Sequence, residues 1–364
     1  MGKNTIAFIL PGLGSGGAER VVTILANKFS ENYRIVIISL YKTYPFYPLN
    51  SNIKLLYCVE AAPNSKNLFQ AILSNFKLLK RISHFIRKEN VKLSLGFLTS
   101  ANVLAVLASK QNNIPVIICE RNNPFLSKAP LFWKLLRKFT YPKANYLVVQ
   151  TQVIMSYYSD LVKAENLILL SNPISPNLTA TKNQRLDKKK IILNVGSFTE
   201  QKGQQLLIKA FAGIKNEGWQ LHLVGKGHRE KEYQELISSL NITDQVKLLP
   251  PTKEIETHYK RASIFAFVSK YEGFPNALIE AMHFGIACIS TNCPTGPSEL
   301  IKNNENGFLV PMNDQNCLQE HLIKLMGDES LRRHFGKNAE ESVKQFEAVK
   351  VAGQWQNLLE KALR

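Results

Sequence analysis

Short, almost continuous runs of Ile, Val, Leu and Phe recur along the whole chain, and each is followed by a helical pattern. The first two runs are Thr5–Leu10 and Arg34–Leu40, with a glycine-rich turn and a helix between them. Because these runs show little alternation of apolar and polar residues, they indicate parallel strands buried on both faces. The same cycle restarts at Ile191–Val195. Two such arrays in series predict an α/β protein with two doubly wound domains.

The length of the chain agrees with this division. Its 364 residues are enough for two domains of about 150–200 residues each. A polar segment with Pro, Ser, Asn and a cluster of lysines separates the two arrays and is typical of a linker. We expect an N-terminal domain at 1–172, the linker at 173–190, a C-terminal domain at 191–345 and a last helix at 346–364.

Cysteine usage and hydropathy indicate the cellular setting. The five cysteines form no C-x-x-C pair, which favours buried free thiols in a reducing compartment and indicates no zinc site. The sequence contains no apolar run of 18 residues, and its apolar start leads into a glycine-rich turn rather than a cleavage site. We therefore expect a cytoplasmic protein without a signal peptide or transmembrane helix.

The positive charge is concentrated in the N-terminal half. The net charge is +18. Residues 1–180 hold 21 Lys and Arg against 7 Asp and Glu, whereas residues 181–364 hold 25 against 21. A one-sided basic field implies an anionic partner, which is nucleic acid, an anionic membrane or a phosphorylated substrate.

The first glycine loop matches G-x-G-x-x-G at Gly12, Gly14 and Gly17, between a strand and a helix. This pattern by itself suggests a dinucleotide site. The second strand, however, ends at Ser39–Tyr41 with no Asp or Glu to hold a ribose diol, which argues against NAD(P). Two interpretations remain, a tight turn with close helix–sheet packing, or backbone N–H groups at the helix N-terminus that face an anion. We favour the second.

The second array opens with a similar turn. Gly196 and Ser197 follow the strand Ile191–Val195, and Lys202 lies just before the next helix. At that position its ammonium group can neutralise a phosphate together with the helix dipole. A solvated lysine beside a glycine turn is the alternative. Gly225 follows the next strand and suits the close approach of a ligand, although any strand-to-helix turn can hold glycine.

The most informative segment is Ser269–Ala281, which follows an apolar strand. Gly273 allows a bend and Pro275 suits the first turn of a helix, so backbone N–H groups from Gly273 to Ala277 are predicted to point at one spot. Glu272 and Glu280 could hold two sets of hydroxyl groups on either side of a diphosphate. The alternative is a surface Glu and a helix salt bridge. The apolar neighbours of Glu280 weaken that alternative, because a partly buried carboxylate needs a partner.

The nine residues EGFPNALIE, which begin at Glu272 and end at Glu280, resemble the paired-Glu motif of retaining GT-B glycosyltransferases of family 4. Further resemblances lie in the family's order across nearly the whole chain. They are SGGAER at Ser15–Arg20, Asn172-Pro173, VGSFTEQKG at Val195–Gly203, the loop Thr295–Glu299 and NGFLV at Asn306–Val310. The resemblance implies two Rossmann-like domains that face a cleft, with the last helix crossing back to the N-terminal domain through Trp355 and Leu358.

The resemblance also implies roles for individual residues. Glu280 would bind the ribose hydroxyls and Glu272 the donor sugar, and Lys202 would stabilise the leaving diphosphate. No metal ion or other cofactor is expected. The implied donor-binding set is Gly16, Gly17, Gly196, Ser197, Lys202, Gly225, Glu272, Gly273, Phe274, Asn276 and Glu280.

Two positions depart from the family pattern. Many members carry Arg where this chain has Ser197, which leaves Lys202 with a hydroxyl group and the backbone to bind the diphosphate. The segment Glu120–Asn123 is polar where many relatives carry His or Asp, and we expect it to line the acceptor side of the cleft. For Glu120 two hypotheses stand side by side, a catalytic acid/base and a structural turn with Arg121.

Two basic stretches of the N-terminal half carry apolar and aromatic residues at helical spacing. One contains Phe69, Ile72, Leu73, Phe76, Leu79 and Ile82 with nearby lysines and arginines, and the other is Leu131–Tyr141. Such stretches suit an anionic membrane surface, where each Lys or Arg contributes about 1 kcal/mol. A core-facing helix with a solvated basic side is the alternative. A lipid-linked acceptor such as a polyprenyl-diphosphate sugar would explain both charge and aromatics, and no nucleic-acid motif is present.

Together these features predict a retaining glycosyltransferase on the cytoplasmic face of the membrane. It would move a hexose or N-acetylhexosamine from a nucleotide-diphosphate sugar to a lipid-linked or polysaccharide acceptor in cell-surface glycan synthesis. UDP is expected over GDP because of its frequency in the family. The alternatives are a nucleotide-sugar epimerase of similar fold and an NAD(P)-dependent enzyme.

Overall fold

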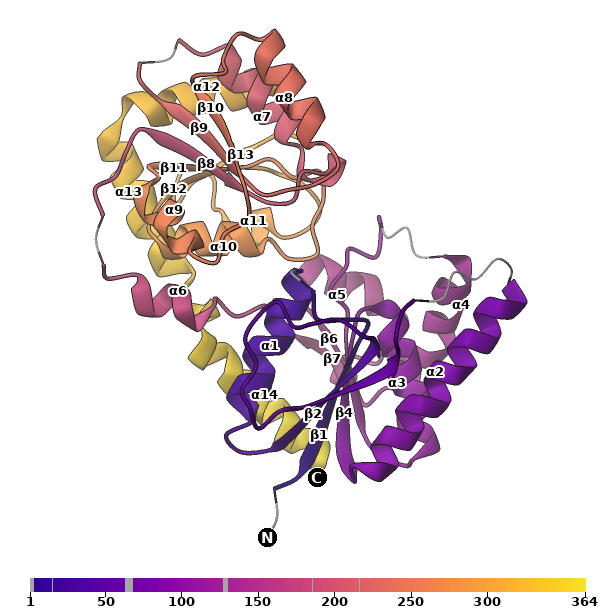
Figure 1. The fold of residues 1–364 in the computed structure, drawn as a ribbon. Helices are drawn as coiled ribbons and strands as arrows, with labels where there is room; N and C mark the ends of the chain where they lie inside the picture. The colour runs from indigo at the N-terminus through magenta and orange to yellow at the C-terminus, as the bar shows by residue number, and fades with distance from the viewer. Residues whose placement is uncertain (1–2, 15, 63–67, 127–129, 185, 216) are drawn as a thin grey trace. The chain divides into compact units, whose positions relative to one another are not determined.

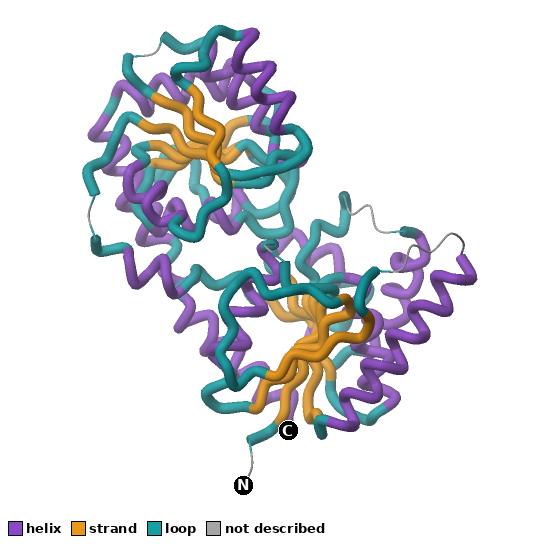
Figure 2. The backbone as a smooth tube through the Cα atoms, in the orientation of Figure 1, coloured by secondary structure: helices purple, strands orange, loops and turns teal. Residues whose placement is uncertain are grey.

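The computed structural model describes residues 3–14, 16–62, 68–126, 130–184, 186–215 and 217–364. The chain forms two compact units, Met1–Pro173 with Ala348–Arg364, and Ile174–Glu347 (Figures 1 and 2). Each unit is a parallel sheet with helices on both faces. Among the described residues, no helix is both long enough and apolar enough to cross a membrane.

The first unit contains a seven-stranded sheet in the order β3-β2-β1-β4-β5-β6-β7, and its described strand pairs are parallel. Its strands are β1 (Thr5–Leu10), β2 (Arg34–Tyr41), β3 (Lys54–Val59), β4 (Val91–Phe97), β5 (Val116–Cys119), β6 (Tyr146–Val149) and β7 (Leu167–Leu169). Its helices are α1 (Gly17–Phe29), α2 (Leu68–Lys88), α3 (Thr99–Gln111), α4 (Leu131–Thr140), α5 (Gln152–Tyr158) and α14 (Ala348–Leu363), with 3-10 turns η1 (Tyr141–Lys143) and η2 (Ala164–Asn166).

Two apolar clusters hold the helices of the first unit to its sheet. One cluster joins the sheet to α2, α3, η1 and α5, and Trp133 and Leu136 of α4 pack against it. The other joins the opposite face to α1 and α14, where Trp355 is fully buried. Every residue of β1 is buried, as the unbroken apolar run predicts for a strand covered on both faces.

The second unit contains a six-stranded sheet in the order β10-β9-β8-β11-β12-β13, again parallel. Its strands are β8 (Ile191–Val195), β9 (Gln220–Val224), β10 (Val246–Leu249), β11 (Ile264–Phe267), β12 (Ala287–Thr291) and β13 (Phe308–Val310). Its helices are α6 (Pro176–Thr181), α7 (Gln204–Ala212), α8 (Glu230–Ser239), α9 (Ile255–Arg261), α10 (Asn276–His283), α11 (Pro297–Leu300), α12 (Gln315–Gly327) and α13 (Glu329–Ser342), with η3 (Glu200–Lys202) and η4 (Lys344–Phe346).

Helices cover both faces of the second sheet. Helices α7, α8 and α12 pack in one apolar cluster, whereas α6, α9, α10 and η4 pack in the other. The segment 173–190, which its composition assigns to a linker, holds α6, and the buried Leu178 joins the second unit's core. Residues 346 and 347 also belong to the second unit, and the chain returns to the first unit at Ala348.

Candidate active site

Three loops at the carboxyl edge of the second sheet carry the motifs of that half. They follow β9, β8 and β11, which are consecutive strands in the sheet. Ligands of doubly wound sheets bind at the carboxyl ends of the strands. The structure therefore brings Gly225, Gly196, Lys202 and Glu272 to one edge, although the last two lie 70 residues apart in sequence.

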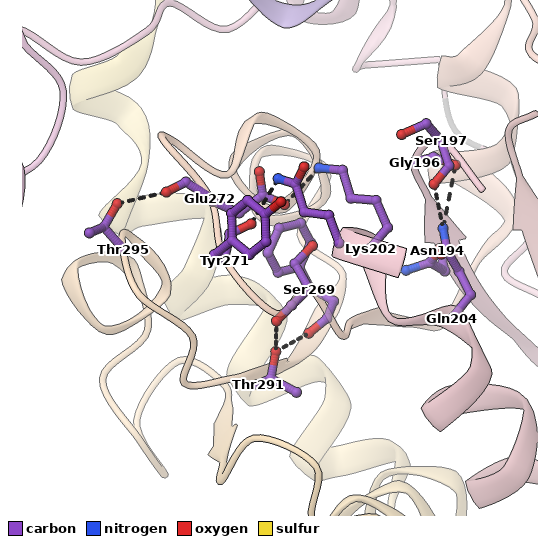
Figure 3. Close-up of polar contacts among 12 residues, drawn as sticks. Asn194, Gly196, Ser197, Lys202, Gln204, Ser269, Tyr271, Glu272, Thr291 and Thr295 are labelled. Carbon is purple, nitrogen blue, oxygen red and sulfur yellow. Dashed lines mark hydrogen bonds and ion pairs between the residues drawn. The ribbon is translucent and has the colours of Figure 1, made fainter. Parts of the chain in front are cut away.

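Lys202 and Glu272 form the central ion pair of this edge, with 2.6 Å between Lys202 Nζ and Glu272 Oε1 (Figure 3). The Glu272 side chain is only 7% exposed, whereas that of Lys202 is 23% exposed. The Thr295 hydroxyl donates to the Glu272 carbonyl at 2.9 Å and holds the backbone of this loop. A buried carboxylate thus lies against an ammonium group that reaches solvent.

The turn that carries Lys202 is held in place by its backbone. Gly203 has φ +65, and a Cβ there would lie 2.1 Å from the carbonyl oxygen of Val268, so only glycine fits. The side-chain amide of Gln201 donates to the Tyr271 carbonyl at 2.9 Å, and the backbone N–H of Lys270 donates to the backbone carbonyl of Gln201 at 2.7 Å. The loops after β8 and β11 are therefore fastened to each other next to the ion pair.

The two glycines after β9 allow its loop to pack against the loop after β8. A Cβ on Gly225 would lie 2.0 Å from the Gly196 carbonyl oxygen, and one on Gly227 would lie 2.2 Å from that of Phe198. At Gly196 itself a Cβ would make ordinary contact with Lys202 at 3.5 Å. The close approach that the sequence suggested at Gly225 is therefore, in the structure, an approach of one loop to the other.

The loop before α10 differs in part from the expectation. The Phe274 ring is buried in the core against Phe346, with 5.8 Å between ring centroids, so its side chain does not face the carboxyl edge. The Asn276 N–H donates to the Phe274 carbonyl at 3.0 Å. The prediction that all N–H groups from Gly273 to Ala277 point at one spot is wrong for Asn276.

Glu280 lies inside α10 and is 2% exposed. The Tyr259 hydroxyl of α9 donates to its Oε2 at 2.9 Å. Burial between Ile279 and Ala281 was predicted to require a partner, and the structure supplies Tyr259. Tyr259 itself carries no motif, and only the packing of α9 against α10 identifies it.

The first glycine loop belongs to the first unit. Gly16 caps α1 with extended backbone, and its carbonyl accepts from the Arg20 N–H at 3.1 Å. A Cβ on Gly16 would lie 2.2 Å from Glu19 Oε2, so a carboxylate of the first helical turn already lies beside this N-terminus. Gly17 is the first residue of the helix, and Ser15 lies outside the described residues.

Glu120 also belongs to the first unit and follows β5. It is 1% exposed, and both of its carboxylate oxygens accept hydrogen bonds. The neighbouring Arg121 is buried, donates to Asn172 Oδ1, and stacks on Phe97 with 5.4 Å to the ring centroid. These contacts favour the structural turn of the two hypotheses for Glu120.

Several large apolar side chains of the first unit are exposed on α2, on α4 and in the loop after β5. We call this set the apolar patch. It comprises Ile72, Leu73 and Phe76 of α2, Phe125 and Leu126 of the loop, and Leu131, Leu135 and Phe139 of α4. Lys80 lies over the Phe76 ring at 4.6 Å, and Lys134 and Lys138 are exposed on α4. The side chain of Phe69 lies outside the described residues.

Comparison with known proteins places the chain in a family. The family model "Glycosyl transferases group 1" matches residues 178–342. An uncharacterized glycosyltransferase of Methanocaldococcus jannaschii is 30% identical over 79% of this chain and 85% of its own length. A Campylobacter jejuni enzyme named as an alpha-1,4-N-acetyl-D-galactosaminyltransferase acting on a diphospho-undecaprenol oligosaccharide is 28% identical over 97% and 98% of the two chains. The Erwinia amylovora amylovoran biosynthesis glycosyltransferase AmsD is 28% identical over 95% and 96%.

Solved structures share the fold. Sucrose-phosphate synthase from Thermosynechococcus elongatus aligns with a TM-score of 0.84 at 20% identity, over 99% of each chain. Anabaena HepE in complex with UDP aligns with a TM-score of 0.78 at 18% identity, over 98% of this chain and 100% of HepE. The prediction of a GT-B fold with two Rossmann-like domains is confirmed. Because these relatives are named as glycosyltransferases, they argue against a nucleotide-sugar epimerase and against an NAD(P)-dependent enzyme. The chain belongs to the group 1 glycosyltransferases and is a glycosyltransferase enzyme.

Proposed function

We propose that the enzyme transfers a hexose or N-acetylhexosamine from a UDP-sugar, with retention of anomeric configuration, to a lipid-linked or polysaccharide acceptor in cell-surface glycan synthesis. The observation that carries the donor assignment is the Lys202–Glu272 pair at 2.6 Å on the carboxyl edge of the second sheet. This edge is where doubly wound sheets bind phosphorylated ligands.

In this proposal Lys202 exchanges its partner when the donor binds. The ammonium group of the Lys202 side chain, which is 23% exposed, moves from Glu272 to the diphosphate, and Glu272 turns to the hydroxyl groups of the sugar. Lys202 then stabilises the charge that develops as the bond between the sugar C1 and the phosphate oxygen breaks. The acceptor hydroxyl attacks the same face of C1, and its proton passes to the leaving phosphate oxygen.

The remaining donor contacts are proposed from the same geometry and the family resemblance. Glu280, held by Tyr259, binds the ribose hydroxyls, and the loops at Gly196–Ser197, Gly225 and Gly273–Phe274 contribute backbone groups or, at Ser197, a hydroxyl group. For Gly16 and Gly17 of the first unit, the proposal rests on the family resemblance alone. Lys202 supplies the positive charge that a divalent cation supplies in metal-dependent transferases. We therefore propose catalysis without a metal ion.

The acceptor side is proposed to work at a membrane surface. The Campylobacter jejuni relative is named as acting on a diphospho-undecaprenol oligosaccharide, and the Erwinia amylovora relative is named for amylovoran biosynthesis. The apolar patch, with the basic side chains around it, suits a peripheral contact with anionic lipid headgroups on the cytoplasmic face. The positive charge of the surface lysines would also attract the negatively charged diphosphate of a lipid-linked acceptor to the first unit.

A direct assay tests the proposal. The purified enzyme is incubated with UDP-sugars, GDP-mannose or NAD(P)H and with a polyprenyl-diphosphate sugar in mixed micelles, with and without EDTA. We expect a larger lipid-linked glycan with one UDP-sugar, an unchanged rate with EDTA, and thermal stabilisation by UDP but not by NAD(P)H. Loss of activity in EDTA would refute the metal-free mechanism, and stabilisation by GDP alone would overturn the choice of base.

A further inference from the structure

We propose that Glu120 is a positioning residue, whose carboxylate fastens the loop that follows β5 to three helices and so presents that loop to the acceptor. We call residues 120–126 the β5 loop. The hydrogen-bond geometry carries the structural part of the proposal by itself, and only the kinetic part depends on the function proposed above. Glu120 does not exchange protons with the substrate.

The contacts of Glu120 occupy its carboxylate. Oε1 accepts from the backbone N–H groups of Arg121 and Asn122 at 3.2 and 3.4 Å. Oε2 accepts from the hydroxyl groups of Tyr141, Thr99 and Tyr158 at 2.8, 3.1 and 3.3 Å. A carboxylate has about four lone-pair sites, and these five donors fill them. A proton from a substrate would have to displace one of these donors.

The donors come from separate elements of the first unit. Thr99 begins α3, Tyr141 follows α4, and Tyr158 ends α5. Burial, followed by the charge of Glu120, raises the pKa of both tyrosines well above the usual value, so their hydroxyl groups stay protonated and donate. Glu120 is therefore the common acceptor of three helical segments and of the loop.

The network continues to the helix that carries part of the apolar patch. Arg137 of α4 is 6% exposed, and it donates to the hydroxyl groups of Tyr158 and Tyr157 at 3.2 and 3.0 Å. The Tyr157 ring in turn lies edge-on to Phe125 of the β5 loop, with 4.9 Å between centroids. The β5 loop is thus held at its base by Glu120 and near its far end by Tyr157, and both supports lead to Arg137.

The substitution Glu120→Gln disrupts this hydrogen-bond network selectively. Glutamine keeps the volume and one acceptor oxygen, but its NH2 group replaces the other oxygen. Turned toward the loop, this group would face the N–H groups of Arg121 and Asn122, and turned toward the helices it would face the tyrosine hydroxyl oxygens. Those oxygens already accept hydrogen bonds, Tyr141 from Asn102 at 3.0 Å and Tyr158 from Arg137 at 3.2 Å. The variant therefore leaves donors facing donors in a buried site, and the loop loses its anchor.

Hydrogen exchange of the purified protein, measured by mass spectrometry, tests the structural part. We expect the amides of Arg121 and Asn122 to exchange at least about tenfold faster in Glu120→Gln, with β8 of the second unit unchanged. Tyr158→Phe removes one of the five donors to Glu120, together with the acceptor of one Arg137 hydrogen bond, and should give a smaller increase in the same segment. The control Glu165→Gln changes an exposed carboxylate of the same unit. Unchanged exchange in the β5 loop, or equal acceleration throughout the first unit, refutes the proposal.

Kinetics separate positioning from proton transfer. In Glu120→Gln we expect the KM for the lipid acceptor to rise at least about tenfold, with a smaller rise in Tyr158→Phe, while kcat falls by less than about threefold and its pH profile keeps its shape. A fall in kcat of about a hundredfold or more, with the loss of one limb of the pH profile, would make Glu120 an acid/base and overturn the proposal. If the wild-type enzyme transfers no sugar to the lipid acceptor, the proposed function fails, and hydrogen exchange still decides the role of Glu120.

Discussion

Replacing Lys202 by Met should separate two effects of its ammonium group, one on folding stability and one on catalysis. Its loss leaves the Glu272 carboxylate, 7% exposed, without its partner at 2.6 Å. Leaving a buried group without its charged hydrogen-bond partner lowers the free energy of unfolding by about 1–3 kcal/mol. Replacing Glu272 by Gln should cost less than about 1 kcal/mol, because the Lys202 side chain, 23% exposed, can turn to solvent. The stability effect is therefore expected to be asymmetric.

The effect on catalysis should not share this asymmetry. Removing one group that stabilises the developing charge typically lowers kcat by about 10²–10³-fold. We expect Lys202→Met to lose at least that much in kcat/KM for the donor. The double variant Lys202→Met/Glu272→Gln should regain most of the lost stability, because no unpaired charge remains, and should stay inactive.

Urea denaturation and initial rates of transfer measure both effects on the same preparations. Lys231→Met is the matched control, because Lys231 forms an exposed pair with Glu235 in the same unit and should change neither quantity. Wild-type stability of Lys202→Met would show that the ion pair does not hold Glu272. Activity within about threefold of wild type would remove Lys202 from the mechanism.

Three further predictions concern other parts of the molecule. Gly203→Ala places a side chain at φ +65 and against a backbone carbonyl at 2.1 Å, so it should cost more than about 1–3 kcal/mol of stability in urea denaturation, and activity should fall with it. Burial, followed by the charge of Lys182, lowers the pKa of His283 to about 4, so protonation favours the unfolded chain below its ordinary pKa of 6.5. Stability should therefore fall by about 2 kcal/mol between pH 7 and pH 5, and His283→Gln should remove this loss. Leu135→Glu/Phe139→Glu should lower cosedimentation with anionic vesicles by at least about tenfold relative to Val349→Glu, an exposed site on α14, and equal binding would refute the membrane contact.

Interior strands could be predicted from the sequence, and so could the edge strand β10 (Val246–Leu249), whereas the other three edge strands could not. Strands β1 and β8 were expected because a strand with neighbours on both sides and helices on both faces is apolar throughout. Strands β3, β7 and β13 were not predicted. They lie at sheet edges, and β7 and β13 have only three residues each. An edge strand buries less of its surface, so its residues carry a weaker apolar pattern.

The residue types of the site were also readable from the sequence, because its loops must bend and must hold charge. Gly196, Lys202 and Glu272 were singled out from glycine and charge spacing after apolar strands. Their partners were not, with Tyr259 for Glu280 as the clearest example. No local pattern marks a tyrosine on α9 as the ligand of a carboxylate on α10, since only packing of the two helices brings them together.

The sequence by itself determined the fold class, the order of its two arrays and the chemical character of the loops, because periodicity, glycine positions and charge are local properties. Only the tertiary structure decided which of these groups meet. It joined Lys202 to Glu272 across 70 residues and enclosed Glu120 among three helical segments. The physical reason is that burial and hydrogen bonding depend on neighbours in space. The same carboxylate is an acid/base at an open loop and an anchor when five donors surround it.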